Sequence, residues 1–393
     1  MIFDSIRRAD DGVSRVELAN STGLSPQTIS NVVRRLLDNG FVREDRTVIS
    51  GPGKPRTVLE LEPDRLFAIG IHLDPGQISI VMVNLRGTVV GSRRFVERDI
   101  ASPDETIAMM ATAVEEMVKD SGHPREHIVG VGVAAPGPID PSQGTIVNPP
   151  LMPGWREVEV VEPLSERLGL DVIIEKDSVA SAIAEQWNGD EEEDRNFLSA
   201  YIGTGVGVGA VIGGEVIRGV SNNAGEIARV RVNRSGGTEE AGEATTFASA
   251  VSYEAVVARA RELGVDVGGN SEGATMYERS QVLGSLIRQA KDGAEPAVAL
   301  AKELNQHWIA LVSELTNIFD VNKVFVGGPV WCELSELLHE DMEAALQDRF
   351  LMREVHDLEV ITSSLGHNLG AIGGACAVLD AALSPKASAL LLR

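Results

Sequence analysis

Apolar residues and glycines alternate through residues 197–232, and this pattern predicts strands rather than helices. An apolar run beginning at Phe197 is followed by a bend at Gly203-Thr204-Gly205 and then by alternating valine and glycine. Gly213-Gly214 separates two further apolar runs, which is typical of a two-residue hairpin turn. The stretch is therefore expected to form a strand, a glycine bend, a second strand, a turn and a third strand.

Backbone without side chains can approach a ligand closely and offer it N–H groups, so this unit is a candidate binding element. A dinucleotide-binding glycine motif would be followed by a helix, which disfavours that interpretation here. Ala224-Gly225-Glu226 favours a ligand site, because it places a carboxylate in a glycine turn just after the hairpin. The alternative is a glycine-rich hairpin that binds nothing.

A similar apolar hairpin occupies residues 68–94, with turns at Asp74-Pro75-Gly76 and Arg86-Gly87. Buried strands are predicted at 129–133, 172–174, 324–326 and 360–362. Helices are predicted at 106–119, 164–168, 178–187, 244–263, 276–318 and from 365 onward. Two hairpin units, each followed by helices, predict a duplicated two-lobe α/β architecture.

Residues 13–39 have the pattern of two helices around a tight turn, which is typical of a helix-turn-helix. Ser14 and Glu17 match a capping box, Gly23 suits a turn with positive φ, and Ser25-Pro26 supplies a cap and a first-turn proline. The apolar residues spaced to close a small three-helix core are Leu18, Leu24, Ile29 and Val32.

Beyond the second helix, short strands at 41–43 and 47–49 are expected to form a hairpin, with a Gly/Pro loop at 51–56. We expect this winged helix-turn-helix domain to span residues 1–62, ending with a strand at 59–61. The body then spans 63–393, with lobes at roughly 64–187 plus the C-terminal helix, and at 188–370.

Polar side chains off the apolar face of the second helix suit base edges and phosphates in a DNA major groove. The candidates on this helix are Ser25, Gln27, Thr28, Ser30, Asn31, Arg34 and Arg35. In the loop, Lys54 and Arg56 are placed to contact the minor groove or phosphates. The alternative is a small helical domain that binds a protein.

Charge is distributed unevenly along the 393 residues, whose net charge is −23. Residues 1–62 hold nine basic and nine acidic residues, so the body carries the whole net negative charge. An acidic body repels nucleic acid, whereas the segment 25–56, with six basic and three acidic residues, does not. The two cysteines form no disulfide framework, and the chain lacks both a secretory signal and a membrane-spanning apolar run, which predicts a cytoplasmic protein.

The chain resembles the ROK family, which joins sugar-responsive repressors and sugar kinases on an actin-like two-lobe fold of the duplicated ribonuclease H-like type. The motifs that carry the resemblance are GVGVAAPGPID (130–140), NPPLMPGW (148–155), IEKDSVASAIAE (174–185), YIGTGVGVGAVIGGEVIRGVSNNAGEI (201–227), VFVGGPV (324–330) and LGHNLGAIGGA (365–375). With the SGPGKPR loop and the helix-turn-helix, they cover almost the whole chain and match the repressor branch.

Kinases of this family begin with a strand that ends in Asp-x-Gly-Gly-Thr and holds magnesium and phosphates. Here His72 replaces the Asp, Asp74-Pro75 replace the glycine pair, and Gly76 replaces the Thr. Proline removes an N–H donor, and Asp74 places negative charge where phosphates would lie, so ATP binding is not expected. Asp177 stands at the position of the family's catalytic base, and we interpret it as a hydrogen-bond acceptor for a ligand, with a helix-capping role as the alternative.

The family's zinc site does not carry over, because Arg229 replaces its His and the loop at 233–243 has no cysteine. No metal or cofactor is therefore expected. The resemblance implies an effector site built from Gly137, Asn148, Lys176, Asp177, Glu226, Arg229 and Thr245. Two added cations and one lost carboxylate favour an anionic effector such as a sugar acid or sugar phosphate. The alternative is that Lys176 and Arg229 pair with Asp177 and Glu226 inside the pocket.

The leading hypothesis is a transcriptional repressor that binds double-stranded operator DNA and responds to a small sugar-like effector. A homo-oligomer, dimer or tetramer, is expected, in which closure of the two lobes changes the separation of the DNA-binding heads. The first rival is an ATP-dependent sugar kinase with a regulatory head. The second is a protein-binding module that sequesters a transporter subunit.

Overall fold

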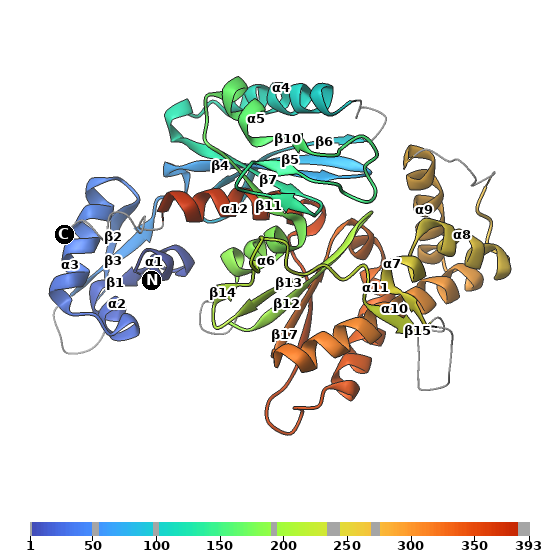
Figure 1. Ribbon diagram of the computed structural model, residues 1–393. Coiled ribbons are helices and arrows are strands. Elements are labelled where there is room, and N and C mark those ends of the chain that lie inside the picture. Colours follow the sequence, from blue (N-terminus) through green and yellow to red (C-terminus); the bar gives the residue numbers. More distant parts are fainter. Residues whose placement is uncertain are drawn as a thin grey trace.

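The computed structural model describes residues 2–48, 55–96, 102–189, 195–233, 244–268 and 276–383. It consists of a small N-terminal domain and a larger body of two lobes, each built on a five-stranded sheet (Figure 1). None of the described helices is long and apolar enough to cross a membrane.

Three helices and a three-stranded antiparallel sheet of order β1-β3-β2 form the N-terminal domain. Its elements are α1 (Ile2–Arg8), β1 (Val13–Ser14), α2 (Arg15–Thr22), α3 (Pro26–Asp38), β2 (Val42–Val48) and β3 (Arg56–Leu61). The capping box predicted before α2 is confirmed: Ser14 Oγ accepts a hydrogen bond from Glu17 N at 3.3 Å, and Glu17 Oε2 accepts one from Ser14 N at 2.8 Å. Gly23 ends α2 with a φ of 67°, and Ser25 caps α3.

The hairpin predicted within 41–49 is wrong, because residues 42–48 form one continuous strand. β2 pairs with β3, and its register shifts between Glu44 and Thr47. The polar run Arg43–Arg46 therefore lies along an exposed strand and is not a turn. The wing of this domain is formed by the paired strands β2 and β3, and Lys54 lies outside the described residues.

The first lobe contains a sheet of order β11-β7-β4-β5-β6. Its elements, after the short helix η1 (Pro63–Arg65), are β4 (Phe67–Asp74), β5 (Gln77–Asn84), β6 (Val89–Val96), α4 (Pro103–Ser121), η3 (Arg125–His127), β7 (Ile128–Ala135), β8 (Ile139–Asp140), β9 (Thr145–Ile146), β10 (Val158–Glu159), α5 (Val161–Leu168) and β11 (Val172–Lys176).

The second lobe contains a sheet of order β14-β13-β12-β17-β18. The remaining elements of the chain are α6 (Asp177–Asn188), β12 (Phe197–Ile202), β13 (Val206–Ile212), β14 (Glu215–Val216), β15 (Arg231–Asn233), β16 (Ala244–Thr246), α7 (Phe247–Ala250), α8 (Tyr253–Glu262), α9 (Met276–Lys291), α10 (Glu295–Phe319), β17 (Lys323–Gly327), α11 (Pro329–Arg349), β18 (Glu359–Thr362), η4 (Gly366–Asn368) and α12 (Leu369–Leu383).

The two sheets share one topology, which confirms the predicted duplication. In each sheet a three-stranded antiparallel meander is extended by two parallel strands: β7 and β11 beside β4, and β17 and β18 beside β12. The strand, bend, strand, turn, strand pattern predicted for residues 197–232 is confirmed as β12, β13 and β14, with Gly213 and Gly214 at positive φ in the turn.

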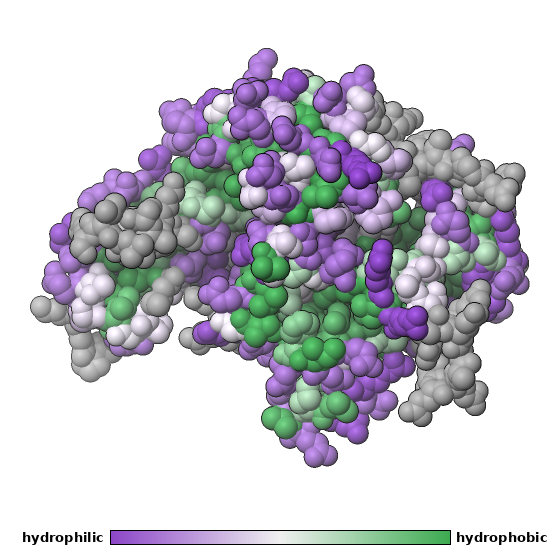
Figure 2. Space-filling view, in the orientation of Figure 1, coloured by the Kyte–Doolittle hydropathy of each residue, from purple (hydrophilic) through white to green (hydrophobic). Residues whose placement is uncertain are grey.

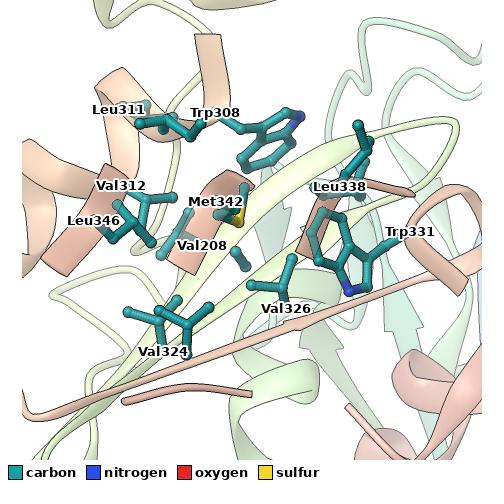
Figure 3. Close-up of a cluster of buried hydrophobic side chains, with 14 of the residues drawn as sticks. Val208, Trp308, Leu311, Val312, Val324, Val326, Trp331, Leu338, Met342 and Leu346 are labelled. Atoms are coloured by element: carbon teal, nitrogen blue, oxygen red, sulfur yellow. The ribbon is translucent and has the colours of Figure 1, made fainter. Parts of the chain in front are cut away.

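Some helix boundaries differ from expectation. The helix predicted at 244–263 begins instead with strand β16 and is divided into α7 and α8, while that at 276–318 is divided into α9 and α10 at Gly293. The sequence analysis did not identify α11, although Trp331, Leu338, Met342 and Leu346 repeat at helical spacing and are buried. They join Trp308 and the sheet valines in the core of the second lobe (Figure 3).

Helices α6 and α12 lie between the two sheets and pack against each other (Figure 1). Glycines make this packing close: a Cβ atom at Gly132 of β7 would lie 1.9 Å from the carbonyl oxygen of Gly374 in α12. One at Gly373 would lie 1.8 Å from the Ala180 carbonyl oxygen in α6, and one at Gly209 of β13 would lie 2.2 Å from the Ser178 carbonyl oxygen. The inner layers of the body therefore follow the order sheet, α12, α6, sheet, while α4 and α5 cover the outer face of the first sheet and α10 and α11 pack on the second (Figure 1).

We expect Gly132→Ala to destabilise the protein by at least about 1–3 kcal/mol, the usual cost of overpacking a core, because the added methyl group meets rigid backbone. Gly284→Ala is the matched control, since its nearest neighbour is the flexible end of Arg288 at 3.4 Å and alanine favours the helix α9. Urea denaturation of both variants measures the difference. Equal stability of the two would contradict the close approach of α12 to the sheet.

Candidate functional site

Helix α3 presents a polar face to solvent and buries the opposite face in the N-terminal domain. Ile29 and Val33 are fully buried. Ser30 is half-buried and donates a hydrogen bond to the Pro26 carbonyl at 2.8 Å. The exposed positions are Ser25, Gln27, Thr28, Asn31, Arg34 and Arg35. The prediction that these side chains lie off the apolar face is therefore confirmed.

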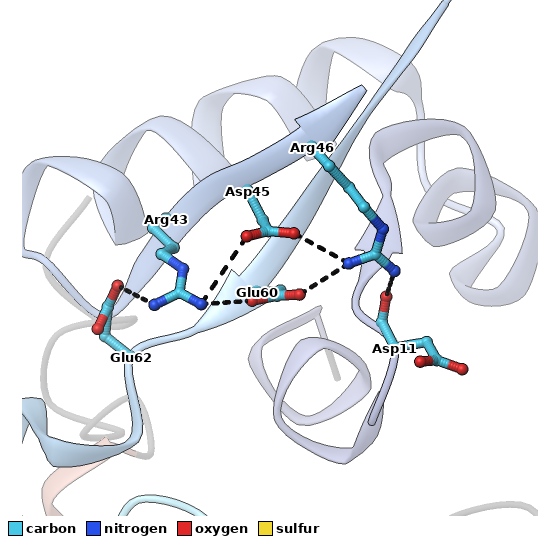
Figure 4. Close-up of polar contacts among 6 residues, drawn as sticks. All are labelled: Asp11, Arg43, Asp45, Arg46, Glu60 and Glu62. Carbon is cyan, nitrogen blue, oxygen red and sulfur yellow. Dashed lines mark hydrogen bonds and ion pairs between the residues drawn. The ribbon is translucent and has the colours of Figure 1, made fainter. Parts of the chain in front are cut away.

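Two wing arginines that could attract phosphate are instead neutralised within the domain (Figure 4). Arg43 Nη2 lies 2.6 Å from Glu60 Oε2, and its Nη1 lies 3.2 Å from Glu62 Oε1. Arg46 Nη1 lies 2.9 Å from both Asp45 Oδ2 and Glu60 Oε1. Carboxylates therefore compensate these arginines, and the network fixes the β2–β3 hairpin against the chain at Asp11, whose carbonyl accepts from Arg46.

Arg34, Arg35 and Arg56 differ from these arginines, because within the described residues none of the three forms an ion pair or a side-chain hydrogen bond. All three are exposed. Arg34 and Arg35 lie on α3, and Arg56 begins β3, where it pairs in register with Val48, the last residue of β2. Arg34 and Arg35 therefore carry positive charge with no carboxylate partner among the described residues, on the helix where the sequence places DNA contacts, whereas Arg56 is close enough to Glu17 to lower the pKa of that carboxyl.

The N-terminal domain docks on the body through α1 and the C-terminal end of α6. Arg7 Nη1 donates to the Trp187 carbonyl at 2.6 Å, and its guanidinium lies 4.1 Å from the centre of the Trp187 ring. Arg8 donates to the carbonyls of Gln186 and Gly189 at 3.1 and 3.2 Å. Cations thus satisfy the carbonyls that a helix leaves unpaired at its end, where the helix dipole favours positive charge.

The opposite end of α6 lies in the cleft between the lobes. Strand β11 ends at the buried Lys176, and α6 begins at Asp177, so the sheet edge brings both side chains to the cleft. Lys176 Nζ lies 3.3 Å from Glu226 Oε2 and donates to the Ala224 carbonyl at 3.2 Å. The glycine turn at Gly225, with a φ of 80°, lets this segment cross close to β13.

The environment of the Asp177 carboxyl group disfavours its ionised form. Its Oδ1 accepts a hydrogen bond from Ser178 N at 2.6 Å, but Asp177 is the first residue of α6 and not its N-cap, and the helix has no side-chain cap, so the capping alternative is not met. Burial raises the pKa of the Asp177 carboxyl above its ordinary value, and attraction to His72 and Lys176 offsets only part of that effect. A ligand that donates a hydrogen bond to this carboxylate would relieve its desolvation.

In the turn between β4 and β5, where the sequence resemblance would place the phosphates of a kinase, the Asp74 side chain bonds to the backbone of the turn. Asp74 Oδ1 accepts a hydrogen bond from Gly76 N at 2.9 Å, and Asp74 and Pro75 are buried. The backbone N–H that a phosphate would use is therefore already bonded to a carboxylate, and Pro75 supplies none.

A cavity of about 380 Å³ opens at this cleft and extends into the second lobe. Among the predicted effector residues, those that line it are Gly137, Lys176, Asp177 and Glu226. Asn148, Arg229 and Thr245 do not line it, and Arg229 is exposed. The structure therefore brings together the residues of β11, α6 and the Glu226 turn, and leaves the other three outside.

Sequence reasoning missed a clasp between the lobes. Asn223 Oδ1 accepts from Ile139 N at 2.8 Å, and Asn223 Nδ2 donates to the Ile139 carbonyl at 2.8 Å. This paired bonding joins the second lobe to the segment after β7. Its signal was the Asn222-Asn223 pair before the Glu226 turn, since Asn is common where the backbone turns sharply.

Among the residues that the structure describes, no group of three or more His, Cys, Asp or Glu side chains is arranged to hold a metal ion. Most of the cysteine-free loop discussed above, residues 234–243, lies outside that part of the chain.

The chain is similar to known proteins over nearly its whole length. The model of the ROK family matches residues 68–381, and a model described as winged helix-turn-helix DNA-binding matches residues 4–43. A putative xylose repressor of Caldicellulosiruptor sp. (strain Rt8B.4) is 24% identical over 94% of this chain and 92% of its own length. A glucokinase of Halalkalibacterium halodurans is 28% identical over 79% of this chain and 94% of its own length.

Among solved structures, a ROK family transcriptional regulator that is a homologue of E. coli MLC protein aligns with 97% of this chain and 94% of its own, at a TM-score of 0.70 and 20% identity. That likeness shows a shared fold. The family model covers both lobes, including β4, the Glu226 turn and α12. The chain belongs to the ROK family.

Proposed function

We propose that this protein is a sugar-responsive transcriptional repressor. The observation that carries the proposal is the exposed polar face of α3, on which Arg34 and Arg35 form no ion pair among the described residues while the wing arginines Arg43 and Arg46 are paired. Phosphate contacts require such free cations, and base readout requires polar side chains on a helix that enters the major groove. The xylose repressors among its relatives support the same function.

A sugar kinase with a DNA-binding head has less support. A glucokinase is among the relatives, and Asp177 stands where the family's base would act. However, the Asp74 carboxylate already accepts the Gly76 N–H, and a negative charge lies where a phosphate would bind. A base without a bound phosphoryl donor transfers nothing.

We infer that the effector is a neutral sugar-like molecule rather than an anion. Lys176 is neutralised by Glu226, which corresponds to the ion-paired alternative for this residue, and Arg229 lies outside the cavity lining. Among the described residues that line the cavity, Lys176 and Arg279 are both paired with carboxylates, so an anion would meet the Asp177 carboxylate without compensation. A polyol would instead donate hydroxyl hydrogen bonds to Asp177 and Glu226.

We infer that α6 transmits effector binding to the DNA-binding domain. One helix connects the two sites, because its first residue, Asp177, lines the cavity and its last carbonyls are held by Arg7 and Arg8. Closure of the lobes on an effector would move α6 with the first or the second sheet. In a homo-oligomer, this movement would change the separation of two heads and hence their fit to paired half-sites.

We expect Arg34→Ala and Arg56→Ala each to weaken operator binding by about 1–3 kcal/mol, or roughly 5- to 150-fold in Kd, with the response to effector intact. Fluorescence anisotropy with DNA selected from a genomic library by this protein measures both quantities. Lys119→Ala is the control, because it removes the same charge from the exposed surface of α4. Unchanged DNA affinity in both arginine variants would refute the assigned DNA surface.

We expect Asp177→Asn to abolish the effector response and to stabilise the free protein at pH 7. The raised pKa means that ionising the buried carboxyl costs stability: the cost is absent below the unfolded-state pKa of about 3.9 and complete above the folded-state pKa. The stability advantage of the variant should therefore shrink as the pH falls toward 4, which denaturation at several pH values measures. An advantage that grows with acidity would contradict this account.

We expect Arg7→Met to uncouple the two sites, since it keeps apolar volume near Trp187 but removes the hydrogen bond and the charge. The ratio of DNA affinities without and with a bound sugar, measured across pentoses and hexoses that include xylose, should fall toward one. Arg15→Met is the control, because Arg15 pairs with Glu44 inside the N-terminal domain. A folded Arg7→Met variant with the full ratio would exclude α6 as the link.

A further inference from the structure

We infer that the second lobe contains a chamber for an apolar group, so that the ligand of this protein is amphipathic. The chamber is the inner part of the cavity that opens at Lys176 and Asp177, passes the Gly203–Gly205 bend and continues between α8, α9, α10 and α11. Figure 2 shows the hollow beside these helices, with hydrophobic residues inside it. The inference rests on the proposed function, because it takes the mouth of the cavity as the sugar site.

Buried apolar side chains form the chamber wall. Figure 3 shows Trp308 of α10 on one side, with Leu338 and Trp331 of α11 on the other. Leu286 of α9 and Leu300 of α10 complete this wall, and all five are at most 5% exposed. Such a surface gains free energy when it contacts an apolar ligand.

Protein interiors are close-packed, and voids larger than a water molecule are few. The whole cavity, mouth and chamber together, has a volume of about 380 Å³, which falls within the range of small-molecule pockets, roughly 300–1,000 Å³. Apolar cavities can bind apolar molecules. The cavity therefore has the size of a ligand site, and the chamber supplies an apolar surface within it.

Two polar atoms in the wall have no hydrogen-bond partner among the described residues, and this second observation also points to a ligand. Asn305 is 3% exposed, and its Nδ2 donates to the Leu338 carbonyl while its Oδ1 has no donor. Tyr253 is 9% exposed, and its hydroxyl has no partner. An unmade hydrogen bond of a buried group is costly, so a bound group that donates to Asn305 Oδ1 would stabilise both molecules.

The two ends of the cavity define the ligand chemistry. At the mouth, the Asp177 and Glu226 carboxylates can accept hydrogen bonds from hydroxyl groups. In the chamber, a ligand would contact apolar side chains and one or two hydrogen-bonding atoms. A glycoside with an alkyl or aryl group fits both ends. A nucleotide does not, because its phosphates would meet the Asp74 carboxylate at the turn.

Isothermal titration of the full-length protein with methyl, butyl and octyl β-xylosides and β-glucosides, below their micellar concentrations, tests the proposal. Each buried methylene contributes about 0.8 kcal/mol, or roughly fourfold in Kd, so the octyl compounds should bind at least about tenfold more tightly than the methyl compounds. Quenching or a shift of tryptophan fluorescence that is reduced in Trp308→Phe places the alkyl chain beside Trp308. Equal affinity of methyl and octyl glycosides would refute the proposal that the chamber binds an apolar group, but it would not contradict the proposed sugar site.

Ala301→Leu fills the chamber from α10 and should remove the octyl advantage without changing methyl glycoside binding. If Ala301→Leu does not fold, Ala297→Leu, which also lines the cavity, can replace it in this test. The matched control is Ala299→Leu, because Ala299 is exposed on the same helix. Binding of 1-octanol without binding of methyl glycosides would support an apolar ligand site in the chamber and would refute the proposed sugar site at the mouth of the cavity. Displacement of the octyl ligand by AMP would overturn the assignment, because it would identify a nucleotide pocket.

Discussion

The close contact of backbone with backbone in the middle of the body is the constraint on which the rest of the structure depends. Gly132, Gly373 and Gly209 let β7, α12, α6 and β13 approach to distances that no side chain would permit. At such distances the two helices cannot slide independently of the sheets, because packed interiors are rearranged in steps rather than deformed continuously. The two lobes are therefore joined through a rigid pair of helices.

Because this packing is rigid, helix α6 can connect the cleft to the DNA-binding domain. Its N-terminal end carries Asp177 into the cleft, and its C-terminal end receives Arg7 and Arg8 from the DNA-binding domain. A helix of this length keeps its two ends in fixed relation, so a ligand that repositions one end also repositions the other. The two hydrogen bonds between Asn223 and Ile139 connect the lobes beside the cavity, so closure of the lobes would change their geometry directly.

Electrostatics separates the surfaces that meet DNA from those that do not. The body is acidic, and in the wing Glu60 and Glu62 pair with Arg43 and Arg46, whereas Arg34 and Arg35 on α3 form no ion pair among the described residues. The same reasoning applies in the cleft, where Glu226 cancels Lys176. The positive charge that Lys176 adds in the sequence is paired with Glu226 in the fold, which is the reason why we propose a neutral effector in place of the anionic one expected from the sequence.

The sequence by itself determined the elements whose signals are local: the capping box at Ser14, the turn at Gly23, the Gly213-Gly214 hairpin and the duplicated order of strands. The hairpin predicted for residues 41–49 was wrong, because exposed polar residues on an edge strand have the same sequence pattern as a turn. Only the tertiary structure decided which cations are paired, that Arg229 lies outside the cavity, and that α11 encloses an apolar chamber. Caps and turns depend on neighbours along the chain, whereas ion pairs and cavities depend on residues that folding brings together from distant segments.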